Sequence, residues 1–201
     1  VRFARRLGLS GYQELKISIA QETAQAQPVV NQNITKDNSC YEIFSKIAND
    51  IYNSLEHTKK VLNNEQLEKA ALKILSAKRI AIFGLGNSSS VAIDAQHKFL
   101  RAGLNAAAYC DNHMQAIAAS HLSKKDVAIG ISHSGSSKDV VEAMKLAKEA
   151  GASTICITNF GKSPIIKQSD IALFTASEET KHSILGMNSR IAQLAIIDSI
   201  Y

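Results

Sequence analysis

The sequence lacks the features that place a chain in a membrane or a secretory pathway. None of its apolar runs reaches the roughly 18 residues that a membrane-spanning helix needs. The basic start, VRFARRLG, is not followed by the apolar segment of a signal peptide. No low-complexity tract indicates disorder, and 45% of the 201 residues are hydrophobic, an ordinary share for a folded domain. We therefore expect a globular, cytoplasmic protein that makes no membrane contact.

Cysteine is scarce and shows no paired spacing. Cys40, Cys110 and Cys156 are odd in number and far apart, with no CxxC pair and no histidine at the spacing of zinc ligands. This pattern argues against a disulfide framework and against a zinc site. It predicts buried thiols in a reducing compartment, and we expect neither a metal nor a cofactor.

The N-terminal stretch indicates the end of a small helical unit. Apolar residues recur at helical spacing from Val1 to Leu7, a break follows at Gly8, and a second helix begins near Ser10. A start at valine in place of methionine is typical of a fragment. The following residues contain Pro28 and several asparagines without any clear period. We predict a helical unit over 1–26, a linker over 27–38 and a larger domain over 39–201.

The larger domain begins with two predicted helices and continues as alternating strands and helices. The helices cover about 39–62 and 64–77, the second with Asn64 as its cap and an inward stripe of Leu67, Ala70, Ala71, Ile74 and Leu75. Five apolar runs follow, RIAIF, NAAAYC, VAIGI, STICIT and IALFT, separated by helical stretches such as 90–102 and 138–150. This alternation predicts an α/β fold with a doubly wound, five-stranded parallel sheet flanked by helices.

Two loops rich in small hydroxyl residues follow strands of this sheet. GLGNSSS, residues 84–90, follows RIAIF, and SHSGSS, residues 132–137, follows VAIGI. Each brings backbone amides and hydroxyls to the start of a helix, where the helix dipole favours an anion. The carboxyl ends of such strands are where ligands bind, so the loops predict a phosphate site. The structural alternative is that Ser90 and Ser137 only cap the next helices.

A dinucleotide site is a second interpretation of the first loop. Gly84, Gly86 and Ser89 approximate the GxGxxG fingerprint, and Asp111 ends the second strand, where an acidic residue can hold a ribose. Against it, Ser89 stands at the third glycine, and a dinucleotide fold gives no reason for the second serine-rich loop.

Together the two loops resemble those of the sugar isomerase (SIS) domain, which binds phosphosugars. The resemblance covers roughly Asn64 to Tyr201. It implies that phosphosugar binding uses Ser88 in the first loop and three hydroxyls in the second, with Ser89 and the Gly135 amide as weaker additions. The three hydroxyls of the second loop are those of Ser132, Ser134 and Ser137.

The two ends of the chain resemble RpiR-family transcriptional regulators. VRFARRLGLSGYQELKISIAQE is similar to the end of that family's helix-turn-helix domain, and SEE (177–179) and MNSRIAQLAIIDSIY (187–201) are similar to its closing region. The resemblance implies a regulator of sugar catabolism. Its operator binding would change when a hexosamine, N-acetyl amino sugar or related sugar phosphate binds the SIS domain. It also implies a homodimer or higher homo-oligomer, since operators are commonly palindromic.

The family pattern places Arg2, Arg5 and Arg6 on or just after the recognition helix, where arginines contact phosphates or guanine edges. The alternative is a solvated basic turn. Because the earlier helices of the DNA-binding domain are not in this sequence, we do not expect the chain alone to bind an operator specifically.

The SIS fold also carries isomerases and lyases, so turnover requires a general base near the sugar. The available groups are Glu178, Glu179, His97, His113, His133 and His182. None of their spacings forms a catalytic pair, and a sensor can use the same groups for recognition. We therefore predict binding without turnover, with His113 and Glu178 contacting the effector, and keep a phosphosugar isomerase or lyase as the alternative.

Overall fold

The computed structural model describes residues 34–177 and 187–201. The chain divides into two compact units, Val1–Asp37 and Asn38–Tyr201, and the second unit contains the sheet and its helices. The helical unit predicted over 1–26, with Arg2, Arg5 and Arg6, lies outside the described residues, and so does Glu178.

Five parallel strands form one sheet in the order β2-β1-β3-β4-β5. They are β1 (Ile80–Gly84), β2 (Ala106–Tyr109), β3 (Val127–Ile131), β4 (Ser153–Asn159) and β5 (Ile171–Thr175). Every residue of β1 and β3 is buried, as expected for central strands covered on both faces. The predicted doubly wound parallel sheet is confirmed, and its strand order reverses between β1 and β3.

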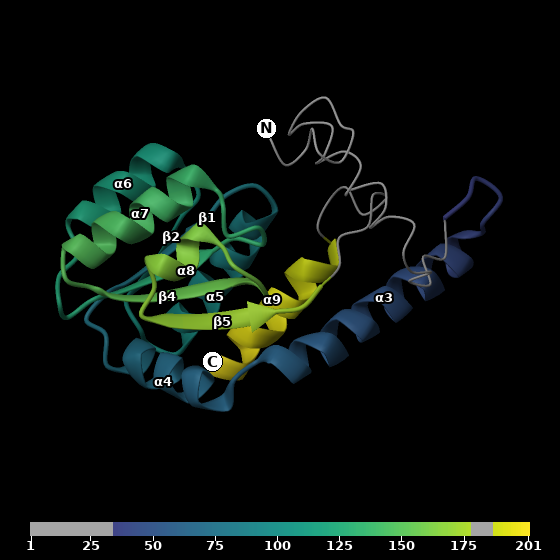
Figure 1. Ribbon diagram of the computed structural model, residues 1–201, viewed down its shortest axis with the longest axis horizontal. Helices are drawn as coiled ribbons and strands as arrows, with labels where there is room; N and C mark the ends of the chain where they lie inside the picture. The colour runs from purple at the N-terminus through teal and green to yellow at the C-terminus, as the bar shows by residue number, and fades with distance from the viewer. Residues whose placement is uncertain (1–33, 178–186) are drawn as a thin grey trace, which may run out of the picture. The chain divides into compact units, whose positions relative to one another are not determined.

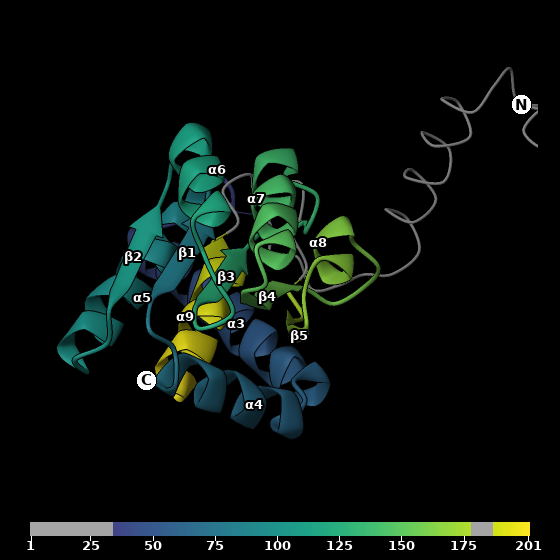
Figure 2. The same cartoon turned by 90° about the vertical axis from the view of Figure 1, so that its left-hand side faces the viewer.

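Helices cover both faces of the sheet, as Figures 1 and 2 show. One layer contains α6 (Asn112–Ser120), α7 (Lys138–Glu149) and α8 (Pro164–Lys167); the other contains α4 (Asn64–Leu75), α5 (Asn87–Arg101) and α9 (Met187–Ile200). The long helix α3 (Cys40–Val61) packs against α9 and β5. Each layer buries its own apolar cluster against the sheet, one around Phe99 and Ile196 and the other around Phe83 and Met144.

Side chains hold α3 near both of its ends. Ser39 and Glu42 form a capping box at the start of α3. Near its other end, the Thr58 hydroxyl accepts a hydrogen bond from the Ala176 amide just after β5, at 3.0 Å.

None of the helices in the described part of the chain is long and apolar enough to cross a membrane.

Helix α4 begins at Asn64 as predicted, but its cap and its last residue, Leu75, differ from the prediction. Its cap is Asn63 and not Asn64, because the Asn63 side chain accepts the hydrogen bond from the Gln66 amide. Ala70 and Ile74 are buried as predicted, but Leu75 is 70% exposed. Each residue of a helix is rotated by about 100° from the last, which turns Leu75 from the buried line towards solvent.

The prediction of buried thiols is correct only for Cys156, which lies inside β4. Cys40 and Cys110 are exposed. Cys40 is the first residue of α3 and Cys110 follows the edge strand β2, so neither position lies within the sheet's core.

A buried carboxylate ties together the amino ends of β1 and β3. The Asp126 side chain accepts two hydrogen bonds from the Arg79 guanidinium, at 3.2 and 2.8 Å, and two from Ser123, from its amide and its hydroxyl, both at 2.8 Å. The Arg79 guanidinium holds the pKa of Asp126 below its ordinary value, so the carboxylate stays charged although the residue is 2% exposed.

Asp126→Asn should lower the free energy of unfolding by about 2 kcal/mol, because an amide cannot replace a charged acceptor of four hydrogen bonds. Urea unfolding measures the change. Since folding lowers this pKa, the contribution is complete above the ordinary aspartate value of about 3.9 and is lost as the pH falls through the lower, folded-state pKa. The variant should therefore show a flatter pH dependence in that range.

Glu142→Gln is the matched control, because it breaks only an exposed pair with Lys145. It should change the free energy of unfolding by less than about 0.5 kcal/mol. Similar losses in the two variants would contradict the structural role assigned to Asp126.

Candidate functional site

The two serine-rich loops begin side by side at the centre of the sheet's carboxyl edge. Strands β1 and β3 pair in register, with Gly84 beside Ile131, and neighbouring strands are about 4.8 Å apart. The first loop leads into α5 in one layer and the second into α7 in the other (Figure 2). Two helix N-termini therefore meet the same edge from opposite faces, at the point where the strand order reverses and where such sheets bind ligands.

Two glycines shape the first loop. Gly86 has a φ of 57°, which glycine adopts readily, and α5 begins directly after it at Asn87. The helix therefore starts three residues before its predicted start at Ser90, whose hydroxyl donates to the Asn87 carbonyl and caps nothing. A Cβ on Gly84 would lie 2.6 Å from the Ser88 carbonyl oxygen, so the first turn of α5 rests directly on the end of β1.

The hydroxyls of the first loop differ in their availability. Ser89 donates to the Gly86 carbonyl at 2.6 Å, and its hydroxyl hydrogen is used within its own turn. The Ser88 hydroxyl makes no hydrogen bond to a described residue and is only half-buried. The geometry therefore favours Ser88 over Ser89 as a donor to a ligand.

The second loop keeps hydroxyl hydrogens free although its oxygens accept hydrogen bonds. The buried Ser132 Oγ accepts from the Gly135 amide at 3.1 Å and lies 3.2 Å from the Ser137 Oγ. The exposed Ser134 Oγ accepts from the Ser136 amide at 3.2 Å. Since a hydroxyl that accepts still has its own hydrogen to donate, Ser134 keeps one donor and the Ser132–Ser137 pair keeps one of its two.

Gly135 anchors the second loop to its neighbours. Its φ is 60°, and a Cβ at this position would overlap the Ser163 hydroxyl and lie 2.7 Å from the Thr158 Oγ1. Its amide, which we predicted as a weaker ligand donor, donates to the Ser132 carbonyl and hydroxyl, each at 3.1 Å. In this conformation the amide holds the loop in shape.

The two helices that start at these loops have no side-chain cap. In α3, α4 and α6 the side chains of Ser39, Asn63 and Asp111 accept a hydrogen bond from an amide of the first turn. The N-cap residues of α5 and α7, Gly86 and Ser137, make no such bond. In α5 the Ser88 and Ser89 amides donate to the Leu85 and Gly86 carbonyls, at 3.2 and 3.1 Å, so this N-terminus attracts an anion mainly through the helix dipole, while no side chain caps the N-terminus of α7. Asp111, the ribose ligand of the dinucleotide interpretation, serves as the cap of α6.

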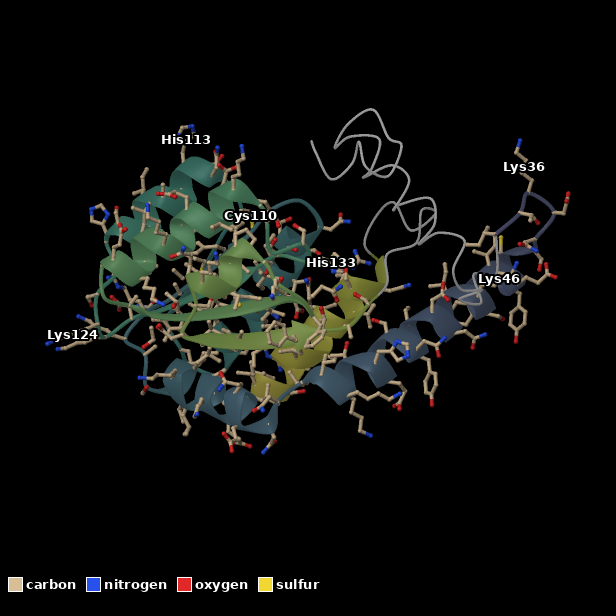
Figure 3. All side chains as sticks on the ribbon, viewed as in Figure 1. Lys36, Lys46, Cys110, His113, Lys124 and His133 are labelled. Carbon is tan, nitrogen blue, oxygen red and sulfur yellow. The ribbon has the colours of Figure 1, made fainter. Side chains whose placement is uncertain are left out.

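The two histidines nearest the carboxyl edge of the sheet differ in exposure. His133 is half-buried within the second loop, whereas His113 is exposed in the first turn of α6 and points outward in Figure 3. His97 is exposed along α5. The remaining acid–base candidates, Glu179 and His182, lie outside the described residues together with Glu178. Within residues 34–177 and 187–201, no group of three or more metal-ligating side chains comes together.

Three residues that shape the site were missed by the sequence analysis. Thr158 and Ser163 support Gly135 from the end of β4 and the start of α8. Gln115 of α6 donates from its Nε2 to the Tyr109 carbonyl at 2.8 Å. A glutamine in an alanine-rich helix does not show in the sequence whether it is buried or exposed, so no local signal pointed to it.

Gly135→Ala should destabilise the protein by more than about 2 kcal/mol, because it adds steric overlap to an unfavourable positive φ. Gly103→Ala is the control: Gly103 has a φ of 78° but no atom within 4 Å of the added methyl group. The control should lose only about 1 kcal/mol. Urea unfolding of both variants tests this, and equal losses would mean that the second loop does not rest on Ser163 and Thr158.

Known proteins are similar to this chain both over the domain that contains the sheet and over its whole length. The SIS domain family matches residues 73–201. An uncharacterized HTH-type transcriptional regulator of Caldanaerobacter subterraneus is 44% identical over 201 residues, which cover all of this chain and 71% of that protein. The HTH-type transcriptional regulator RpiR of Escherichia coli is 32% identical over 203 residues, covering all of this chain and 68% of that protein.

A solved structure extends the likeness. The Vibrio vulnificus NanR protein complexed with ManNAc-6P matches all of this chain and 70% of its own, with a TM-score of 0.78 and 26% identity. The fold and the serine-rich edge define a SIS domain. The chain belongs to the RpiR family of HTH-type transcriptional regulators, in which that domain forms part of a longer protein.

Proposed function

We propose that the two serine-rich loops bind the phosphate group of a sugar phosphate effector. The observation that carries this proposal is the pair of uncapped helix N-termini at adjoining strand ends, together with hydroxyls that still have a hydrogen to donate. Ser88 and Ser134 are the first donors, and the Ser132–Ser137 pair adds another. Ser89 and the Gly135 amide contribute only if the loops rearrange.

Such a site suits an effector that must be released again. Hydroxyls and amides bind an anion through directed hydrogen bonds and the helix dipoles, without the fixed charge of an arginine. The first turn of α5 contains no acidic residue that would repel a phosphate, whereas the first turn of α7 contains Asp139. Binding is therefore specific for the geometry of a phosphate group while remaining reversible.

The sugar end of the effector decides which compound is recognised. The NanR structure holds ManNAc-6P, which favours an N-acetyl amino sugar phosphate or a related hexosamine phosphate for this chain. We assign His113 and Glu178 to the sugar. His113 points outward in Figure 3, away from His133 in the second loop, so its contact with the sugar requires a rearrangement of the site.

The protein acts as a sensor and not as an isomerase in this proposal. Its relatives are named as transcriptional regulators, and phosphate binding alone supplies no general base. A phosphosugar isomerase or lyase is the second candidate, favoured by the position of His133 inside the phosphate loop.

In the intact regulator the bound effector would alter operator binding by a dimer or higher assembly. Arg2, Arg5 and Arg6 would contact the DNA. A ligand changes operator affinity only if it binds the DNA-competent and DNA-incompetent arrangements unequally, and such couplings are typically about 1 to 3 kcal/mol. Helix α3 is suited to carry the change, because Thr58 ties it to the chain just after β5.

Calorimetric titration with N-acetylmannosamine 6-phosphate and with glucosamine 6-phosphate tests the proposal. Ser134→Ala and Ser132→Ala should each weaken binding by about tenfold or more, because each removes a hydrogen bond to a charged group. Ser199→Ala is the control, since its hydroxyl donates to the Ala195 carbonyl on the exposed side of α9. Affinity that is unchanged in both loop variants would refute the assignment.

A further inference from the structure

Helix α6 carries a fully buried amide at the junction of the first two strands. Gln115 is 0% exposed, in a helix whose neighbouring residues are largely alanine. Its Nε2 donates to the carbonyl of Tyr109, the last residue of β2, at 2.8 Å. The same nitrogen lies 3.5 Å from the carbonyl of Gly84, the last residue of β1. One side chain therefore reaches the carboxyl ends of both strands.

The orientation of this amide follows from its partners. Both neighbouring atoms are carbonyl oxygens, which only accept hydrogen bonds, so the NH₂ group must face them and the Oε1 must point elsewhere. The Gln115 Oε1 is buried and has no hydrogen-bond partner among the described residues. An unpaired buried acceptor is unfavourable, and an apolar side chain would avoid that cost. Sequences depart from such local rules most often at functional sites.

Each strand end held by Gln115 touches the first serine turn. Gly84 packs so closely on Ser88 that a Cβ would lie 2.6 Å from the Ser88 carbonyl oxygen. Cys110 directly follows Tyr109, and its Sγ lies 3.8 Å from the Ser89 carbonyl oxygen. The second loop is held separately, since Gly135 rests on Thr158 and Ser163.

We propose that Gln115 is a positioning residue for the first serine loop. It fixes the ends of β1 and β2 relative to each other, and the first turn of α5 is built on those ends. It thereby sets the position of the Ser88 hydroxyl towards the phosphate without touching the ligand. This inference rests on the proposed function, because it assigns Gln115 a role in the same phosphate site.

Gln115→Met tests the role with inorganic phosphate as the probe, titrated by phosphorus NMR. Methionine has a similar volume and helix propensity but makes no strong hydrogen bond. The variant should bind phosphate roughly fivefold more weakly than the wild type, the effect of one lost hydrogen bond. Gln96→Met is the matched control: it also removes a glutamine hydrogen bond to β2, at the Ala108 amide, but does not touch Gly84. Its phosphate affinity should equal that of the wild type.

A double-mutant cycle separates positioning from general destabilisation. If Gln115 acts through Ser88, Gln115→Met should add little to the loss already caused by Ser88→Ala, whereas its loss should multiply with that of Ser134→Ala in the other loop. Multiplying losses in both cycles, or wild-type affinity in Gln115→Met, would overturn the proposal. If the wild-type chain itself fails to bind phosphate, the proposed function fails as well.

Gln115→Glu keeps the test decisive if the methionine variant does not fold. Burial raises the pKa of a carboxyl group, and only its protonated form has an O–H, which can donate to one strand carbonyl as the Gln115 amide does to Tyr109. Affinity relative to the wild type at the same pH should therefore be lost at pH 8 and largely recovered at pH 5. A loss that does not depend on pH would contradict the donor role.

Discussion

Parallel pairing of β1 with β3, in register and at the centre of the sheet, is the constraint on which the site depends. It places the ends of two strands side by side, and right-handed crossover connections send the following helices to opposite faces. Both helix N-termini then face the same small region. Their positive ends favour an anion there. The glycines at positions 86 and 135 make the sharp turns that this arrangement requires.

The interactions around this edge divide into those that support the loops and those left for a ligand. Gly84 and Gly135 allow close packing against Ser88 and Ser163, and several hydroxyls are used within their own turns. At the opposite edge, the Arg79–Asp126 pair fixes the amino ends of the same two strands. The site is thus held rigidly while a few hydroxyl hydrogens remain unused. Preorganised donors of this kind lose little conformational freedom when a ligand binds.

The sequence allowed the sheet and the positions of both loops to be predicted, because buried strands and loop glycines leave strong local signals. It did not show which serines are available. Ser88 and Ser89 are adjacent and chemically identical, and only the structure shows that Ser89 donates to the Gly86 carbonyl within its own turn. The cap of α4 and the start of α5 were misplaced because Asn63 and Asn64 are equally good caps by residue type and because Ser90 has the residue type of a cap but does not act as one. The role of Gln115 depends on its approach to Gly84, which is 31 residues away in the chain, and no local pattern contains such a contact.

A phosphorus NMR spectrum of N-acetylmannosamine 6-phosphate, recorded with and without the protein over several hours, tests the central claim most directly. The account predicts that the phosphate resonance shifts or broadens on addition of the wild-type protein, that Ser134→Ala reduces this effect, and that no new resonance grows with time. A resonance that the protein leaves unchanged would contradict the phosphate site for this compound and its class. A new resonance that increases with time would show turnover and contradict the sensor.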